Sequence, residues 1–301
     1  MKRAGWVFAL AGAAFAWNVL RRHKAVDLHH KVVIITGASV GIGKAAAHAF
    51  AAKGARVVLV ARRAELLEQV KAGLAPYHVP VLVCPADVTN DDDLRRVVET
   101  VLREFGRIDV LVNNAGLSMG GAFGEHDPND IRRLLDLNLY SVIRLTQLVL
   151  PVMLRQLSGH IVNVSSMASD LRTPGMSVYT ASKAGMNALS DVLRRELDGT
   201  GVLISKVLPT WTGTDMISAM NVDHMRRARL VMEPLMKYDD AEDVAQAIVD
   251  AVRYKRSEVL MGGLGTILAL RGARNSAFVT DLVYRYYFNR DELVKLLRVV
   301  G

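Results

Sequence analysis

The stretch KVVIITGASVGIG, residues 31–43, decides the fold of this chain of 301 residues. Residues 32–35 form a short β-branched apolar run, which is typical of a fully buried parallel strand. Gly37, Gly41 and Gly43 follow this run, and a helical stretch extends from about 43 to 53. Glycines let a backbone turn tightly and approach a phosphate, and the start of a helix offers it free N–H groups. The stretch therefore predicts a strand–turn–helix unit that binds a pyrophosphate.

The same alternation continues along the chain. Further strands are expected near 56–61, 79–84, 108–113, 159–164, 202–208 and 258–261, and helices near 63–74, 91–105, 128–155, 178–199 and 240–253. This order predicts a single α/β domain with a doubly wound parallel β-sheet of the Rossmann type, whose ligands bind at the carboxyl ends of the strands. We place this α/β domain at residues 26–263, after an N-terminal hydrophobic helix in 1–25 and before a C-terminal tail, 264–301.

The N-terminal run AGWVFALAGAAFAWNVL, residues 4–20, is almost entirely apolar. As a helix it would span about 25 Å, just under the thickness of a hydrocarbon core, with Trp6 and Trp17 near its ends. We expect membrane association through this segment, as an anchor with the α/β domain facing the cytosol; a soluble cytoplasmic protein is the second choice. A cleaved signal peptide and a helix lying on the membrane or packed on the domain are the alternatives.

Charge is concentrated at the two ends of the chain, whose net charge is +8. Residues 25–252 are slightly acidic, while 1–24 carry five Lys or Arg and no acid, and 253–301 carry nine Lys or Arg against four acids. A nucleic-acid enzyme would carry its positive charge on the central domain, so we expect no nucleic-acid partner. Basic ends suit an anionic membrane surface. The tail 264–301 forms either an amphipathic helix on the membrane or a segment packed on the domain or a partner subunit.

The single cysteine, Cys84, excludes an intrachain disulfide and is expected to be a buried, inert thiol.

The glycine spacing resembles the TGxxxGxG pattern of the short-chain dehydrogenase/reductase family, and four later stretches match that family in order over residues 28–262. They are Asp87-Val88, the turn Asn113-Asn114-Ala115-Gly116, Asn138 in the long helix, and Ser166 with the pair Tyr179 and Lys183. The resemblance implies a nicotinamide-dependent oxidoreductase that interconverts a carbonyl and an alcohol. It implies that the cofactor is bound by Gly37, Ser39, Gly41, Ile42, Gly43, Asp87, Val88, Asn114, Ala115, Gly116, Tyr179 and Lys183.

The four candidate catalytic residues have distinct implied roles. Tyr179 and Lys183 lie four positions apart, so they share one face of a helix. An adjacent ammonium lowers the pKa of a phenol, and we expect Tyr179 to exchange a proton with the substrate oxygen. By the resemblance, Lys183 also binds the nicotinamide ribose, Ser166 holds the substrate oxygen, and Asn138 holds a water that links Lys183 to solvent. Ser165 is adjacent to Ser166, but strand alternation places the two on opposite sides.

The cofactor is predicted to be NADP(H) rather than NAD(H). The second strand ends at Ala61-Arg62-Arg63 and has no acid there to bind the ribose hydroxyls of NAD. An arginine makes forked hydrogen bonds to phosphate, so Arg62 is expected to bind the 2′-phosphate of NADP. The other basic NADP marker of the family is absent, because Val40 precedes Gly41. A pair of solvated arginines is the alternative.

Residues 209–214, PTWTGT, resemble the family's loop over the nicotinamide. The resemblance implies cofactor contacts from Pro209, Thr212 and Thr214. The family usually has glycine after this proline, whereas here Thr210 restricts the backbone.

The substrate is expected to be a lipophilic small molecule such as a steroid, a retinoid or a fatty acyl ketone. The membrane segment and the methionine-rich stretch 213–239 favour this class, although these methionines suit a core or a dimer interface equally well. We expect a homodimer or homotetramer built on the helices near 128–155 and 178–199. Two other functions remain open: a non-catalytic dinucleotide-binding sensor or scaffold, and an epimerase or dehydratase of the same fold.

Overall fold

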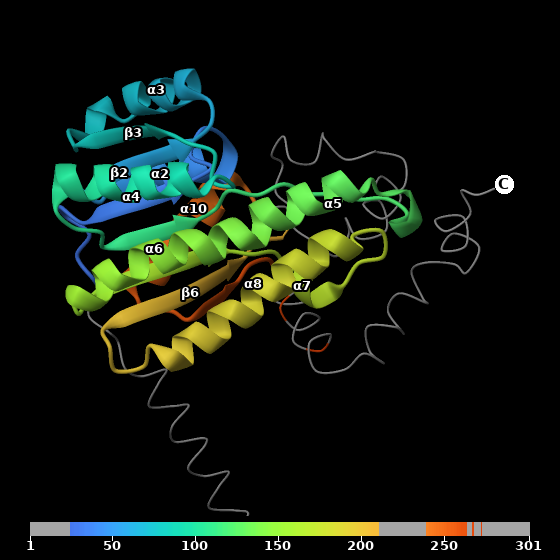
Figure 1. Ribbon diagram of the computed structural model, residues 1–301. Helices are drawn as coiled ribbons and strands as arrows, with labels where there is room; N and C mark the ends of the chain where they lie inside the picture. Colours follow the sequence, from blue (N-terminus) through green and yellow to red (C-terminus); the bar gives the residue numbers. More distant parts are fainter. Residues whose placement is uncertain (1–24, 211–238, 264–266, 268–271, 273–301) are drawn as a thin grey trace, which may run out of the picture.

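A seven-stranded, wholly parallel sheet forms the centre of the molecule (Figure 1). The computed structural model describes residues 25–210, 239–263, 267 and 272. The strand order is β3-β2-β1-β4-β5-β6-β7, so the chain leaves β1 to build one half of the sheet and returns beside β1 to build the other. The strands are β1 (Val32–Thr36), β2 (Arg56–Ala61), β3 (Val81–Pro85), β4 (Val110–Asn113), β5 (Gly159–Val164), β6 (Val202–Leu208) and β7 (Glu258–Leu260). The predicted doubly wound sheet is confirmed; the N-terminal hydrophobic helix lies outside the described residues.

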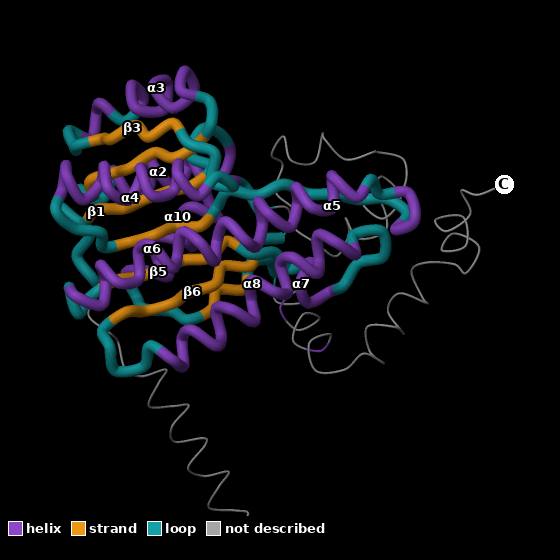
Figure 2. The backbone as a smooth tube through the Cα atoms, viewed as in Figure 1, coloured by secondary structure: helices purple, strands orange, loops and turns teal. Residues whose placement is uncertain are grey.

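Helices cover both faces of the sheet (Figure 2). One face carries α2 (Gly41–Ala51), α3 (Ala64–Gly73) and α10 (Ala241–Arg253), and the other carries α4 (Asp91–Phe105), α6 (Ser141–Arg155) and α8 (Ser177–Glu196). The remaining helical segments are η1 (Ala75–Tyr77), η2 (Phe123–Glu125), α5 (Pro128–Leu135), η3 (Asp136–Tyr140) and α7 (Ala168–Leu171). Because both faces are covered, the central strands read as continuous apolar runs, and all five residues of β1 are buried.

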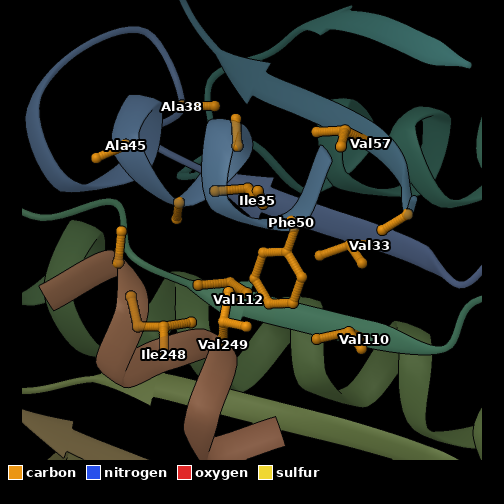
Figure 3. Close-up of a cluster of buried hydrophobic side chains, with 14 of the residues drawn as sticks. Val33, Ile35, Ala38, Ala45, Phe50, Val57, Val110, Val112, Ile248 and Val249 are labelled. Atoms are coloured by element: carbon orange, nitrogen blue, oxygen red, sulfur yellow. The ribbon is translucent and has the colours of Figure 1, made fainter. Parts of the chain in front are cut away.

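Two large clusters of buried apolar residues pack against the sheet, one on each face. Phe50 from α2 lies at the centre of the cluster beneath α2, α3 and α10, beside Val33, Val110 and Val249 (Figure 3). Its ring is fully buried between the sheet and α10. Burying a phenyl side chain contributes about 2–3 kcal/mol, so this contact fixes α2 firmly on β1. The glycine loop between β1 and α2 is thereby held in place from both ends.

The long helix expected at 128–155 is interrupted. It consists of α5, one π-helical turn at η3, and α6. Taken together, Pro128–Arg155 is long and apolar enough to cross a membrane, and among the described residues it is the one helix of which this is true. Its α6 part packs into the apolar cluster on the face of the sheet that carries α4, α6 and α8, through Leu145, Val149 and Met153, as a core helix does.

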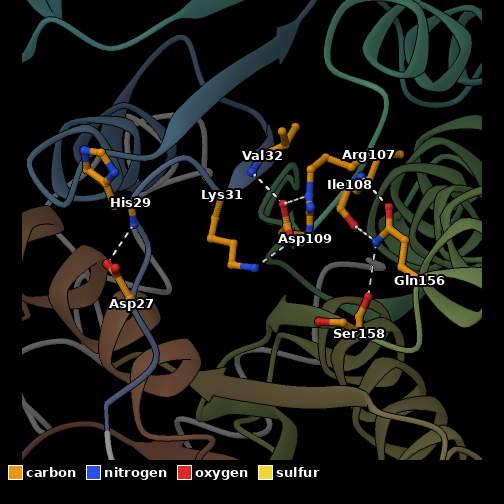
Figure 4. Close-up of polar contacts among 9 residues, drawn as sticks. All are labelled: Asp27, His29, Lys31, Val32, Arg107, Ile108, Asp109, Gln156 and Ser158. Atoms are coloured by element: carbon orange, nitrogen blue, oxygen red, sulfur yellow. Dashed lines mark hydrogen bonds and ion pairs between the residues drawn. The ribbon is translucent and has the colours of Figure 1, made fainter.

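At the amino ends of β1 and β4, Asp109 accepts hydrogen bonds from Arg107, from Lys31 and from the backbone N–H of Val32 (Figure 4). Burial opposes ionisation of Asp109, but these donors outweigh it and lower the pKa of the carboxyl group. Gln156 joins this edge to α6 by hydrogen bonds with the backbone of Ile108, at 3.0 and 2.7 Å. These bonds fix the register of the sheet at the edge opposite the glycine loop.

Candidate active site

The glycine loop at the carboxyl end of β1 has a backbone that other residues would not tolerate. Gly37 and Gly41 have positive φ angles of 66° and 52°. A Cβ at Gly43 would overlap the carbonyl oxygen of Gly37, so α2 can approach the strand only at a glycine. The loop and the start of α2 therefore leave backbone N–H groups facing the space above the sheet, as phosphate binding requires.

Thr36 and Asn114 join this loop to the turn after β4. The Thr36 hydroxyl accepts hydrogen bonds from the backbone N–H groups of Asn114 and Ala115, both at 3.0 Å. The Asn114 amide in turn donates to the Thr36 carbonyl at 2.9 Å. The glycine loop and the predicted NNAG turn thus form one rigid unit at the point where the strand order reverses.

A cavity of about 800 Å³ opens at this point. Ten of the residues predicted to bind the cofactor line it: Gly37, Ser39, Gly41, Ile42, Arg62, Asp87, Val88, Asn114, Ala115 and Gly116. Its volume suits a large ligand, and its position is where doubly wound sheets bind dinucleotides. The residues present therefore fit a nicotinamide dinucleotide. Gly43, Tyr179, Lys183 and Pro209 lie outside this lining, and Thr212 and Thr214 lie outside the described residues.

Sequence reasoning missed several lining residues. They include Thr89, Leu117, Arg133, Leu137 and Ala241. Thr89 and Leu117 directly follow the predicted stretches Asp87-Val88 and 113–116, whereas only the folded arrangement of α5, η3 and α10 brings the other three to the cavity. An amphipathic reading of α5 could have identified Arg132 and Arg133 as exposed, but not which of the two faces the cavity.

Asn138 is fully buried in the π-helical turn. Its side-chain oxygen accepts from the backbone N–H of Leu117 at 2.9 Å, and its amide donates to the carbonyl of Leu117 at 2.8 Å and to Ser182 at 3.2 Å. Both amide protons are therefore used, and one lone pair of the oxygen is left. That oxygen faces Gly116, at which a Cβ would lie 3.2 Å away.

Lys183 reaches the same glycine from α8. A Cβ at Gly116 would lie 3.5 Å from its Nζ, which also donates to the carbonyl of Val164 at 3.0 Å. The side chain is buried, and burial lowers the pKa of Lys183 to about 8. Gly116 lines the cavity, so Asn138 and Lys183 both lie next to a residue of the cavity wall without lining the cavity themselves.

Tyr179 is buried one helical turn before Lys183, whose Nζ lies 5.9 Å from the centre of the phenol ring. Burial raises the pKa of Tyr179, and a hydrogen bond with Ser166 opposes that rise. From the sequence we expect Lys183 to lower the pKa of Tyr179, whereas in the structure this pKa is raised. The reason is that burial disfavours both charged forms, the phenolate and the ammonium.

The two neighbouring serines take different positions, as strand alternation predicts. The Ser166 hydroxyl accepts from the backbone N–H of Ala168 at 3.1 Å and bonds Tyr179. The Ser165 hydroxyl instead donates to the backbone carbonyl of Lys183 at 3.4 Å. Ser166 is thus the serine beside the phenol, while Ser165 ties β5 to α8.

At the end of β2, Arg63 donates to the Ser39 hydroxyl at 3.2 Å and so connects to the glycine loop. The side chain of Arg62 has no hydrogen bond or ion pair within the part of the chain that the structure describes. Both arginines line the cavity, and Arg62 is the one whose guanidinium remains available to an anion.

At the end of β6, Thr210 occupies the position where the family usually has glycine. Its backbone N–H and its hydroxyl both donate to the same carboxylate oxygen of Asp239, each at 2.7 Å. Both residues are buried. The preceding residue, Pro209, accepts from the backbone N–H of Met167, directly after Ser166, at 3.0 Å. Asp239 thus fixes the strand end that contacts the Ser166 turn, a role that its sequence position does not reveal.

Comparison with known proteins agrees with this site. The family model for short chain dehydrogenases matches residues 31–224, and the chain belongs to this family of oxidoreductases, which act on carbonyl and CH–OH groups with a nicotinamide dinucleotide. A ketoacyl reductase of Nostoc sp. is 35% identical over 85% of this chain and 89% of its own length. The predicted family and enzyme class are confirmed.

The solved structures that are similar to this one include two with a bound nicotinamide cofactor. A metagenomic short-chain oxidoreductase in complex with NADP is 30% identical, with a TM-score of 0.66, over 78% of this chain and 98% of that chain. A 7α-hydroxysteroid dehydrogenase complexed with NADH and 7-oxo glycochenodeoxycholic acid is 28% identical, with a TM-score of 0.73, over 79% of this chain and 95% of that chain.

Proposed function

We propose that this chain is an NADP(H)-dependent carbonyl reductase or alcohol dehydrogenase for a lipophilic substrate, with Asn138, Ser166, Tyr179 and Lys183 as its catalytic residues. The observation that carries the proposal is the burial of Tyr179 and Lys183 beside Ser166 and Gly116. Gly116 also lines the cavity that the glycine loop forms. The proposed proton-transfer groups therefore lie next to Gly116, which forms part of the wall of a dinucleotide-sized cavity.

In the reductive direction, Tyr179 donates its phenolic proton to the substrate carbonyl oxygen, which Ser166 holds by a hydrogen bond. The nicotinamide supplies the hydride to the carbonyl carbon when the cofactor is bound. Because its pKa is about 8, Lys183 is mainly an ammonium at pH 7 and favours the phenolate that Tyr179 leaves. The ammonium would then pass a proton to the Tyr179 phenolate and become a neutral amine. A water held by the remaining lone pair of Asn138, whose oxygen lies near the same point beside Gly116 as Lys183 Nζ, would return a proton from solvent to the lysine.

The preference for NADP(H) rests on Arg62. Its guanidinium lies at the cavity and has no partner among the described residues, and no acid follows β2 to bind the ribose hydroxyls of NAD. A forked pair with the 2′-phosphate would compensate its charge. The similar metagenomic oxidoreductase was solved with NADP, whereas the similar 7α-hydroxysteroid dehydrogenase was solved with NADH.

Two of the similar proteins favour a lipophilic substrate. One is named a ketoacyl reductase, and the other was solved with 7-oxo glycochenodeoxycholic acid. Both names point to a ligand whose carbonyl group is attached to a largely apolar skeleton. The apolar N-terminal segment 4–20 supports the same class, because it would hold the enzyme at a membrane where such molecules dissolve. The methionine-rich stretch 213–239 lies, apart from Asp239, outside the described residues.

The experiment is a screen of NADPH and NADH oxidation with purified full-length protein in detergent. Oxo steroids, retinal and 3-oxoacyl thioesters are tested against small polar ketones of equal carbonyl reactivity. We expect turnover with at least one lipophilic carbonyl and a lower KM for NADPH than for NADH. Turnover confined to small polar ketones would contradict the lipophilic class, and an equal or lower KM for NADH would contradict the cofactor preference.

We further propose that residues 4–20 anchor the protein in a membrane with its catalytic domain on the cytosolic side, where NADPH is supplied. Sequence composition alone supports this arrangement. Protection of an N-terminal tag and digestion of the catalytic domain by protease added to the cytosolic face would agree with it. A domain that resists the protease until detergent is added would contradict the orientation.

A further inference from the structure

The cavity contains one cationic side chain for which the proposed function has no use. Arg133 lines it from α5, whereas Arg62 and Arg63 line it from the segment that follows β2. With three arginines and one lining acid, Asp87, the charge around the cavity is strongly positive. One oxygen of the Asp87 carboxylate, Oδ1, accepts from the backbone and the hydroxyl of Thr89 at 2.9 and 2.7 Å.

The guanidinium of Arg133 makes no hydrogen bond or ion pair within the residues that the structure describes. Its neighbour Arg132 is equally exposed but does not line the cavity. Helix position explains the difference, because Arg133 lies one turn before Leu137, which also lines the cavity. Leu137 in turn directly precedes Asn138, whose buried hydrogen bonds to Leu117 fix this part of the chain.

The other two arginines have assignable roles. Arg63 bonds Ser39, and Arg62 is the proposed 2′-phosphate ligand at the end of β2. The anionic groups that remain on a bound dinucleotide are those of its pyrophosphate. The start of α2 offers N–H groups to them, and its N-cap, Val40, has no side chain that could satisfy these groups. Arg133 lines the same cavity as Gly41 and Ile42 of α2, so its guanidinium would add a charge-assisted bond to the same anionic groups.

We propose that Arg133 is a binding residue for the pyrophosphate of the dinucleotide, the group that NADPH and NADH have in common. The proposal rests on the proposed function, because it assumes that a dinucleotide occupies the cavity. It assigns a division of labour: Arg62 distinguishes the two cofactors, and Arg133 strengthens the binding of both. Fork geometry makes an arginine better suited to this task than a lysine.

The test measures binding rather than turnover, so it does not depend on the substrate. Dissociation constants of NADPH and NADH are determined by fluorescence titration of the full-length wild type and of Arg133→Gln, Arg133→Lys and Arg62→Ser. Arg132→Gln is the matched control, since it removes the same charge from the same helix turn. Circular dichroism and thermal unfolding of each variant confirm that it is folded.

We expect Arg133→Gln to weaken NADPH and NADH equally, by about tenfold, as the loss of one charge-assisted contact predicts. Arg133→Lys should recover part of the loss, Arg132→Gln should bind as the wild type does, and the loss should shrink as salt is raised. Unchanged affinities in Arg133→Gln, a loss confined to NADPH, or an equal loss in Arg132→Gln would each overturn the proposal. If the proposed function itself is wrong, the wild type will bind neither dinucleotide; if only the assigned role of Arg62 is wrong, Arg62→Ser will not selectively weaken NADPH.

Discussion

Lys183 shows how the proposed chemistry would come at the expense of stability. Burial lowers the pKa of its ammonium from 10.5 to about 8, so at pH 7 the fold holds a buried charge whose one hydrogen-bond partner among the described residues is the Val164 carbonyl. A shift of this size corresponds to a cost of about 3 kcal/mol. Stability is given up here so that an ammonium can lie beside Tyr179 and Gly116.

Lys183→Met is therefore expected to abolish turnover and to raise the melting temperature at pH 7 in the absence of cofactor. Between pH 8 and 10.5 the unfolded wild type binds more protons than the folded one, so wild-type stability rises with pH across that window. The advantage of the variant should be largest below pH 8 and disappear toward pH 10.5. Thermal unfolding at several pH values measures it; a variant less stable than the wild type at every pH would contradict the burial argument.

Motif spacing predicted ten of the residues that line the cavity, because each motif residue is tied to a strand end or to the start of a helix. Strand alternation separated Ser165 from Ser166 and the family spacing selected Ser166; the structure gives the two serines different partners. The sign of the Tyr179 pKa shift was not predictable, because it depends on how much of the phenol is buried. Arg133 was missed for a related reason: only the placement of α5 decides which of two adjacent arginines faces the cavity.

Among the secondary-structure elements, the bounds of α4, β5 and β6 agree with the predicted ones, since caps and glycines mark their ends. The π-helical turn at Asp136–Tyr140 was not predicted, because the apolar pattern runs through it without interruption. The turn coincides with Asn138, whose side chain bonds Leu117 on another segment. Such a local departure from helical geometry reflects a tertiary contact, which periodicity does not contain.

The connection between β6 and α10 depends on Asp239. Asp239→Ala removes the acceptor of two buried hydrogen bonds from Thr210, so we expect the free energy of unfolding to fall by about 2 kcal/mol. We also expect a lower kcat, because the variant releases the strand end that contacts the Ser166 turn. Asp239→Asn presents an oxygen at the same place and should recover most of both quantities. Equal behaviour of the two variants would show that the hydrogen bonds do not position the site.

Pairing of β5 with β6 includes a histidine that stays neutral. His160 contacts the Ser205 hydroxyl at 2.6 Å, and Ser205 donates its one proton to the carbonyl of Arg256, so the imidazole nitrogen must be the donor. Burial, helped by the charge of Lys255, lowers the pKa of His160 to about 3. The folded state therefore cannot take up a proton that the unfolded chain binds below pH 6.5.

We expect this residue to contribute to acid sensitivity. Wild-type stability should fall as the pH drops from 6.5 toward 3, by up to about 1.4 kcal/mol per pH unit from this group. His160→Gln keeps a side-chain N–H donor but does not titrate, so its unfolding free energy should change less over the same range. His78→Asn, at an exposed histidine, is the control. Parallel pH curves for wild type and His160→Gln would exclude this role.

At the scale of the whole molecule, the parallel sheet and its layering followed from the strand–helix alternation, because parallel strands need helical crossovers that cover both faces. The order of the strands within the sheet was not part of the prediction. The domain boundaries, the membrane segment and the tail remain predictions, since they fall mostly outside the described residues. Subunit assembly also remains a prediction, because a single chain cannot display its partner.

We propose a homodimer or homotetramer built on the helical stretch 128–155 and on α8. Tyr140 and Val192, on these two elements, are 46% and 48% exposed and so leave apolar area for a partner. Val192→Glu is therefore expected to shift the protein toward the monomer, as light scattering in detergent would show. A wild type that stays monomeric over a dilution series would contradict the proposal.

The most direct measurement compares NADPH binding and NADPH oxidation in the wild type and Tyr179→Phe, with the best substrate from the carbonyl screen. The phenol donates a proton to the substrate but makes no charged contact with the cofactor. Tyr179→Phe should therefore bind NADPH within about twofold of the wild type and lose about a hundredfold or more in kcat. Wild-type turnover in Tyr179→Phe would contradict the account, because the proton would then come from another group.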